Sequence, residues 1–302
     1  MVKAGILAIG FCMEKIDPTA RVGKDVELGE GVEIGPWCVL EGNIRLGKNA
    51  RLLSSVKLRG PLTIGANVTI YPDAALGYPA QDFKVKPDSP TGGVIIGDDC
   101  TFREGVTIHA ATHVEIPTRV GHQCYFMVQS HAGHDCQIGN NVTIVNSAVL
   151  GGHCEIFDNV TIGGLTAIHQ FVRVGRYAFV SGYSGFTTDI PPFCMAYGRN
   201  RMQGINQVGL RRAKFSRDHI QKLRTVYREA LQSAVTRPES IAICERFARE
   251  CPPAQEIADF LRASKRPIAP GAMRPPREMV AFLQARRRGD TVWGVESEEP
   301  SM

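Results

Sequence analysis

The sequence predicts a mainly β protein, a left-handed parallel β-helix followed by a small C-terminal α-helical domain. Three observations support this prediction. Large aliphatic residues recur at steps of six, a small or apolar residue follows most of them by four positions, and a helical period replaces this repeat beyond Pro192. Because strands alternate with a period of two and helices with a period of 3.6, a period of six indicates short flat strands joined by corners, three to a coil.

The six-residue repeat is expected to build the β-helix over residues 16–192. Its anchors should fill the inside of a three-sided prism, and hexapeptides of this form resemble those of left-handed β-helices. A sheet sandwich would instead need turn signals every 8–12 residues. The anchors are Ile16, Val22, Leu28, Ile34, Leu40, Leu46, Leu52, Leu58, Ile64, Ile70 and Leu76, then Ile96, Phe102, Ile108, Val114, Val120, Phe126, Ala132, Ile138, Ile144, Leu150, Ile156, Ile162, Ile168, Val174 and Val180.

Glycine often follows the anchor directly, as at Gly29, Gly35 and Gly47. We expect these glycines to supply the positive φ that a tight turn requires. Cysteines share the position four residues after the anchor with alanine and valine, and they are expected to pack in the corners rather than to bind metals or form disulfides. These cysteines are Cys38, Cys100, Cys124, Cys136 and Cys154.

Two segments are expected to leave the prism as loops. Residues 77–95 are rich in proline and glycine, and Ala111 to Thr118 contains Pro117, although the six-residue register continues through it at Val114. Loops that leave a rigid scaffold are where binding residues concentrate.

The helical period predicts a C-terminal helical domain over residues 193–265. One helix should begin after an N-cap at Ser216, a second near Pro238, and a third should include Phe260. The remaining residues, 266–302, form a proline- and arginine-rich tail that we expect to be weakly ordered.

Composition excludes several classes of protein. A chain of 302 residues with 43% hydrophobic and 22% charged residues is neither wholly disordered nor a collagen or coiled coil. The N-terminal extension, residues 1–15, holds an apolar stretch too short to cross a bilayer and without a clear cleavage site, and Met13 is an alternative start. We therefore expect a cytoplasmic protein with reduced thiols and no transmembrane segment.

Five of the eight histidines fall in the later coils, outside the inward-facing columns: His109, His131, His134, His153 and His169. Three repeats make an eighteen-residue coil, so His134, Gly152 and Gln170 should stack at one corner, as should Asp135 and His153. An imidazole beside a glycine backbone suits general-base catalysis with a backbone oxyanion donor. Zinc binding by histidines between subunits and a purely structural role as polar turn residues remain alternatives.

Several motifs, occurring in one order, give the chain a resemblance to a known family. They are Gln81–Lys84 (QDFK), Gln129–Cys136 (QSHAGHDC), Gly151–His153 (GGH), Ile168–Phe171 (IHQF), Asp189–Pro192 (DIPP), Gly204–Asn206 and Phe215–Ser216. Over roughly residues 14–265 the sequence resembles the acyl-ACP:UDP-N-acetylglucosamine O-acyltransferases, which open lipid A synthesis. The resemblance implies transfer of a 3-hydroxyacyl chain from acyl carrier protein to the 3-position of a UDP-glucosamine derivative, by a homotrimer without a cofactor or metal.

The resemblance also assigns roles to residues. His134 would be the general base, Asp135 would polarise it, and the Gly152 N–H would stabilise the oxyanion. The remaining assignments are sugar and diphosphate contacts from a neighbouring subunit by Gln81, Asp82 and Lys84, a cleft lined by His131, His153, His169 and Gln170, nucleotide contacts by Asn206 and Arg212, and an acyl-chain ruler at Gly182.

The chain departs from the family pattern near the expected nucleotide and sugar site. Val208 stands where an acidic residue is usual, Ala213 replaces a second arginine, and residues 110–118 lack the usual arginine and glycine-rich turn. These departures leave open a paralogue that acts on a modified UDP-sugar, a zinc-dependent carbonic-anhydrase-like β-helix, and a non-catalytic scaffold that binds nucleotide sugars.

Charge is distributed unevenly along the chain. Residues 1–190 hold 15 Lys and Arg against 18 Asp and Glu, whereas residues 191–302 hold 20 against 12. A basic C-terminal half suits docking of the acidic acyl carrier protein. Nucleic acid is disfavoured because the basic residues lack interleaved aromatic residues and a recognised module. The expected docking residues are Arg173, Arg176, Arg199, Arg201, Arg211, Arg212 and Lys214.

Overall fold

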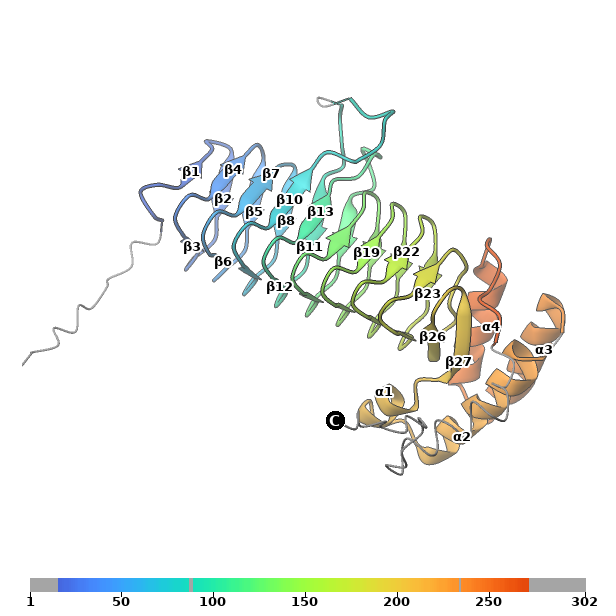
Figure 1. Cartoon of the computed structure of the whole chain (residues 1–302). Helices are drawn as coiled ribbons and strands as arrows, with labels where there is room; N and C mark the ends of the chain where they lie inside the picture. The colour runs from blue at the N-terminus through green and yellow to red at the C-terminus, as the bar shows by residue number, and fades with distance from the viewer. Residues whose placement is uncertain (1–15, 87–88, 234, 272–302) are drawn as a thin grey trace, which may run out of the picture.

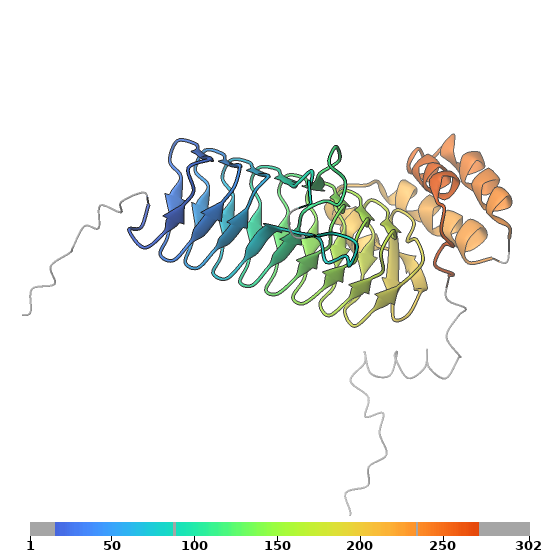
Figure 2. The same cartoon turned by 90° about the horizontal axis from the view of Figure 1, so that it is seen from above.

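The computed structural model describes residues 16–86, 89–233 and 235–271, and it shows a three-sided parallel β-helix with helices at its C-terminal end (Figure 1). The predicted fold class is confirmed. The chain passes repeatedly through three sheets, here named B, C and A in the order in which it meets them, so that each coil contributes one short strand to each sheet. Seen from above, the coils stack along one axis and the helices gather at one end (Figure 2).

The three sheets are parallel except at the last strand of sheet A, β27, which turns back antiparallel to β26. Sheet B contains β1 (Arg21–Val22), β4 (Val39–Glu41), β7 (Lys57–Arg59), β10 (Ala75–Tyr78), β13 (Thr107–His109), β16 (His131–Ala132), β19 (Val149–Leu150), β22 (Ala167–Ile168) and β25 (Gly185–Phe186). Sheet C contains β2 (Val26–Leu28), β5 (Ile44–Leu46), β8 (Leu62–Ile64), β11 (Val94–Ile96), β14 (Thr118–Val120), β17 (Gln137–Ile138), β20 (Glu155–Ile156) and β23 (Arg173–Val174). Sheet A contains β3 (Glu33–Ile34), β6 (Arg51–Leu52), β9 (Thr69–Ile70), β12 (Thr101–Phe102), β15 (Tyr125–Phe126), β18 (Thr143–Ile144), β21 (Thr161–Ile162), β24 (Phe179–Val180), β26 (Cys194–Tyr197) and β27 (Arg201–Ile205).

The predicted anchors form the core of the prism. From Ile34 onward they are buried, apart from Val114, and the residues four positions later are buried with them, apart from Ala80 and Thr112 in the two loops. The five corner cysteines are buried free thiols, as predicted. Val114 is the exception because residues 110–117 form a loop between β13 and β14, which leaves Val114 exposed. Val114 keeps the six-residue spacing only because the loop happens to have a matching length. Its assignment as an anchor is wrong.

The glycines after the anchors serve a purpose other than the one predicted. The positive φ falls three residues after the anchor, for example at Asn49 and Asp135, and not at Gly29, Gly35 or Gly47. Glycine is needed after the anchor because adjacent coils approach there. A Cβ at Gly47 would lie 2.5 Å from the carbonyl carbon of Gly65 in the next coil.

Both loops leave the same corner, where the chain turns from sheet B to sheet C, and we call this corner BC. One loop joins β10 to β11 and the other joins β13 to β14. The loops are joined to each other, since Thr91 Oγ1 donates to the Ala111 carbonyl and the Gly92 N–H donates to the His113 carbonyl at 2.7 Å. Figure 1 shows the first loop projecting from the prism.

The helices follow the end of the prism. The repeat predicts that the β-helix ends at residue 192, whereas β26 still adds to sheet A beyond it. The helices are α1 (Gln207–Arg212), α2 (Arg217–Val226), the π-helix η1 (Tyr227–Leu231), α3 (Arg237–Ala248) and α4 (Pro253–Ala263). Ser216 caps α2 by accepting the His219 N–H, as predicted. Of the predicted tail, residues 272–302 lie outside the described residues, and among the described helices none is long and apolar enough to cross a membrane.

Arg173 and Arg176 join the prism to α4. The Arg173 guanidinium lies 4.6 Å from the centre of the Phe260 ring and pairs with Glu155 at 2.8 Å. Arg176 pairs with Glu256 of α4. Both side chains therefore hold the helical domain against the last coils, where planar guanidinium groups suit combined ion pairing and stacking.

We expect Gly47→Ala to destabilise the protein by about 1–3 kcal/mol, because the added methyl group must push adjacent coils apart. Gly185→Ala is the matched control, since a Cβ at Gly185 meets nothing within 4 Å. Chemical denaturation of both variants checks this expectation. Equal midpoints for the two variants would show that coil spacing does not require glycine at position 47.

Candidate active site

The expected catalytic residues lie together at corner BC. His134 and Asp135 form the turn between β16 and β17, and Gly152 and His153 occupy the same turn one coil later, between β19 and β20. The His153 N–H donates to the His134 carbonyl at 2.9 Å, which confirms the predicted stack with an eighteen-residue spacing. This corner also carries both loops.

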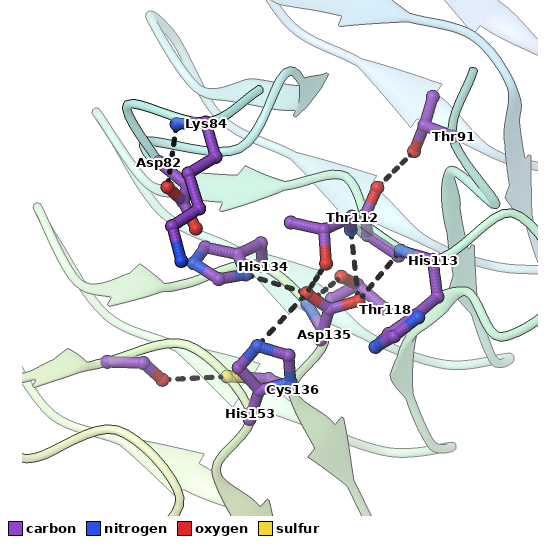
Figure 3. A network of polar contacts seen from close by, with 12 residues as sticks. Asp82, Lys84, Thr91, Thr112, His113, Thr118, His134, Asp135, Cys136 and His153 are labelled. Atoms are coloured by element: carbon purple, nitrogen blue, oxygen red, sulfur yellow. Dashed lines mark hydrogen bonds and ion pairs between the residues drawn. The ribbon is translucent and has the colours of Figure 1, made fainter. Parts of the chain in front are cut away.

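His134 and Asp135 form a closely bonded pair (Figure 3). His134 Nδ1 lies 2.6 Å from Asp135 Oδ2. Asp135 is buried, and it also accepts the backbone N–H of Thr112 at 3.0 Å and the Thr112 hydroxyl at 2.8 Å. Burial raises the pKa of Asp135, but the hydrogen bonds from His134 and Thr112 outweigh it and hold that pKa below its ordinary value. The ionised carboxylate therefore keeps the proton of His134 on Nδ1 and leaves Nε2 as the basic atom.

Gly152 gives the His134 ring its space. A Cβ at this position would lie 2.6 Å from both Cε1 and Nε2 of His134, so no residue with a side chain fits without moving the ring. The imidazole consequently lies directly against the Gly152 backbone, with its free nitrogen on that side.

The Gly152 N–H has no acceptor among the residues that the structure describes. At the corner between sheets C and A, which we call corner CA, the equivalent N–H groups are accepted by a side chain of the next coil. There the Asn140 N–H donates to Asp158 Oδ1 at 2.7 Å, and the His122 N–H donates to Asn140 Oδ1 at 2.9 Å. At corner BC the equivalent residue of the next coil is Gln170, which is exposed and does not accept the Gly152 N–H, so a buried donor is left beside the basic nitrogen.

Further histidines surround the pair. His153 Nε2 lies 3.5 Å from Asp135 Oδ2, and its ring stacks on Phe171 with centres 4.5 Å apart. Burial lowers the pKa of His153, and the Asp135 charge opposes this shift. His131 projects from β16 and shares a hydrogen bond of 2.8 Å with Thr107, and burial lowers its pKa.

His169 and Gln170 lie in the next coil of the same corner, and both are exposed. His169 Nδ1 lies 3.1 Å from the Gln170 carbonyl. Their side chains therefore border the pair on its C-terminal side, at one further coil from Gly152.

The first loop lies over this corner. Asp82 Oδ1 accepts the Lys84 N–H at 2.9 Å, and the Asp82 charge slightly opposes the lowering of the His153 pKa that burial causes. Figure 3 shows Lys84 extending from this loop on the side of His134. Gln81 and Lys84 are exposed.

His113 was not selected from the sequence, although it belongs to this cluster. It lies in the second loop, and its N–H contacts Asp135 Oδ1 at 3.3 Å. One ligand atom each from His113, Asp135 and His153 lies within 4.8 Å of the other two, which is the spacing of a candidate metal site. The signal in the sequence was a histidine inside a segment already predicted to leave the prism.

The other expected site residues lie at other corners of the chain. Asn206 and Arg212 line a groove of about 350 Å³ at corner CA, together with Tyr177 and Ala213. Both ends of the Asn206 amide are hydrogen-bonded within the chain. Its oxygen accepts the Gly209 N–H and its nitrogen donates to the Tyr177 carbonyl, both at 3.0 Å. Gly182 lies at the third corner, between β24 of sheet A and β25 of sheet B.

Known proteins share this architecture. The acyl-[acyl-carrier-protein]–UDP-N-acetylglucosamine O-acyltransferase of Thermodesulfovibrio yellowstonii is 40% identical over 258 residues, which cover 85% of this chain and 99% of that protein. The enzyme of the same name from Sinorhizobium fredii is 38% identical over 82% of this chain and 92% of its own length. This chain belongs to the acyl-[acyl-carrier-protein]–UDP-N-acetylglucosamine O-acyltransferase family.

Two further comparisons agree with membership of this acyltransferase family. The model of a family described as UDP N-acetylglucosamine O-acyltransferase, domain 2, matches residues 189–269. The solved UDP-N-acetylglucosamine acyltransferase of Francisella novicida is 32% identical with a TM-score of 0.81, over 86% of this chain and 95% of that one. The resemblance read from the motifs is confirmed, and the chain is an enzyme, an acyltransferase.

Gly152→Ala is expected to lower kcat/KM for acyl transfer by about 100-fold, because the methyl group displaces the His134 ring from its position. Steady-state assays beside circular dichroism check this result, and Gly185→Ala serves again as the control. Full activity of Gly152→Ala would show that the position of the ring is not constrained by this contact.

A pH dependence follows from His109, which is buried beside His131 with ring centres 5.0 Å apart. Burial and the nearby charges of His131 and His134 lower the pKa of His109 to about 4. Because the unfolded chain binds this proton at a higher pH, stability falls as the pH decreases from about 6.5 towards 4, by about 2–3 kcal/mol at pH ~4.5. We expect His109→Phe to lose less thermal stability than the wild type between pH ~7 and pH ~4.5. Equal losses would contradict this assignment.

Proposed function

We propose that this enzyme transfers a 3-hydroxyacyl chain from acyl carrier protein to the 3-hydroxyl of UDP-N-acetylglucosamine, the first step of lipid A biosynthesis, in the cytoplasm. The observation that carries the proposal is the His134–Asp135 pair with its basic nitrogen against Gly152, whose N–H has no acceptor among the described residues. The named relatives of the chain support the choice of donor and acceptor.

The mechanism needs a base and an oxyanion donor. His134 Nε2 takes the proton of the sugar hydroxyl while its oxygen attacks the thioester carbonyl of the acyl carrier protein. The Gly152 N–H stabilises the tetrahedral oxyanion, and Asp135 stabilises the imidazolium that forms. Collapse of the intermediate breaks the C–S bond, and His134 returns the proton to the thiolate. Neither redox chemistry nor a cofactor enters these steps.

The acceptor is expected to extend from corner BC to residues at another corner. Arg212 is exposed in the corner CA groove and offers a planar fork for a diphosphate, and Lys84 offers a mobile point charge beside His134. Corner CA of the same chain is separated from corner BC by the face that sheet C forms, so a second copy would have to bring its own groove to the base. We therefore propose that the site lies between chains of a homotrimer.

Two residues that depart from the expected family pattern, Val208 and Ala213, bear on which UDP-sugar is the acceptor. Val208 is exposed next to the corner CA groove, where an acidic residue is usual, and Ala213 lines that groove. A 3-amino UDP-sugar is the second candidate acceptor, because these departures lie at the nucleotide site while the His134–Asp135 pair is intact. The same pair disfavours a catalytically silent scaffold.

The acyl carrier protein is expected to dock on exposed basic residues near the end of the prism. Arg173 and Arg176 are occupied by contacts to Glu155 and Glu256, so they contribute less than predicted. The remaining candidates have no carboxylate partner within the described part of the chain, and they are Arg199, Arg201, Arg211, Arg212 and Lys214. Long-range attraction to an acidic carrier would raise the association rate at low salt.

His134→Ala is expected to lower the rate of acyl transfer by about 10²–10⁴-fold, and Asp135→Asn to lower it through loss of the orienting charge. His122→Ala, which removes an exposed histidine at corner CA, should leave the rate unchanged. Mass spectrometry of products from UDP-N-acetylglucosamine and its 3-amino analogue, with acyl carrier proteins bearing several chain lengths, measures the rates and identifies the acceptor. Near-wild-type transfer by His134→Ala would refute the mechanism.

A further inference from the structure

The second loop places a third polar group against Asp135 and His153. The backbone of His113 is held from both sides, because its N–H contacts Asp135 Oδ1 at 3.3 Å and its carbonyl accepts the Gly92 N–H at 2.7 Å. Its side chain is exposed, and its ring centre lies 6.0 Å from that of His153 in an edge-to-face arrangement. Figure 3 shows His113 and His153 approaching Asp135 from two sides.

We propose that His113, Asp135 and His153 bind one divalent transition-metal ion, such as Zn²⁺, and that the bound ion inhibits acyl transfer. His153 Nε2 and Asp135 Oδ2 are 3.5 Å apart. Two ligands of a tetrahedral zinc with bonds of about 2.1 Å lie about 3.4 Å apart, so this pair already has the required separation. The three ligand atoms lie within 4.8 Å of one another, so a movement of the exposed His113 imidazole by roughly 1 Å would bring its nitrogen to the separation that a tetrahedral ion requires.

The donor set selects the kind of ion. Two imidazoles and one carboxylate suit zinc and its neighbours among the transition metals, whereas Mg²⁺ and Ca²⁺ prefer oxygen ligands. Asp135 is held in place by the Thr112 N–H and hydroxyl, and such outer contacts fix the orientation of a metal ligand. Three protein ligands leave a fourth position open towards solvent on the side of His113.

Inhibition follows from the atom that the metal shares with the catalytic pair. Asp135 Oδ2 is the partner of His134 Nδ1 at 2.6 Å, and it is also the oxygen nearest to His153 Nε2. An ion bound to this oxygen withdraws negative charge from His134 and competes with their hydrogen bond. This consequence rests on the proposed function, in which Asp135 orients the base, whereas metal binding itself does not.

Calorimetric titration of the full chain with Zn²⁺ tests the binding. We expect one ion per chain in the wild type and affinity at least 10-fold weaker in His113→Ala. His122→Ala is the matched control, because His122 is also exposed and lies 3.3 Å from a carboxylate oxygen of Asp98, but lacks the third ligand. Equal zinc affinity in the wild type and His113→Ala, or a loss of affinity in His122→Ala alone, would overturn the assignment.

Titration of acyl transfer with Zn²⁺ tests the inhibition. The wild type and His122→Ala should lose activity as zinc is added and regain it with a chelator, whereas His113→Ala should need at least 10-fold more zinc. Zinc that binds the wild type without slowing transfer would refute the inhibition. Absence of transfer by zinc-free wild type would refute the proposed function, and calorimetry would still decide the metal site.

Discussion

Close stacking of the coils in an eighteen-residue register is the constraint on which the rest of the structure depends. Strands of successive coils pair directly, so their backbones lie one strand spacing apart, about 4.8 Å. Where a glycine follows the anchor, as at Gly29, Gly35 and Gly47, the next coil lies too close for a side chain. The register also sets each residue directly above its equivalent in the previous coil, which turns sequence spacing into columns in space.

The active site is a local variation of that column structure. At corner CA, aspartate and asparagine side chains accept the N–H groups of the coil before them. At corner BC, Gly152 has no side chain to do so, and the space goes to the His134 ring. The absent side chain thus creates room for the proposed base, whereas the Gly152 N–H stays available because Gln170, the equivalent residue of the next coil, does not accept it among the described contacts. The geometry of the candidate site therefore arises from the scaffold through a change of residue type at a few positions and through the second loop, which holds Asp135 by Thr112.

The periodic part of this arrangement could be predicted from the sequence, and the rest could not. Six-residue spacing indicates the prism, and eighteen-residue spacing indicates that His134 lies above Gly152. The contribution of His113 has no period to reveal it, because a loop returns to the corner through contacts such as the one between Gly92 and His113. The contact of the Asn206 amide with the Tyr177 carbonyl likewise joins α1 to a coil 29 residues earlier in the chain, which spacing alone does not give.

The rigidity of the prism bears on how the sugar, the nucleotide and the acyl chain of the proposed substrates could be bound together. The proposed base His134 lies at corner BC, the groove with Arg212 at corner CA and Gly182 at the third corner, and the hydrogen-bonded sheets between these corners keep them apart. A flexible enzyme would close a lid over its substrates, whereas a stacked solenoid can combine its corners only by placing copies side by side. The stiffness of the fold therefore supports the proposed trimer, as does the distribution of its residues. In the proposed function, discrimination among acceptors then depends on the loops and the groove, while the proposed base stays on the rigid coils.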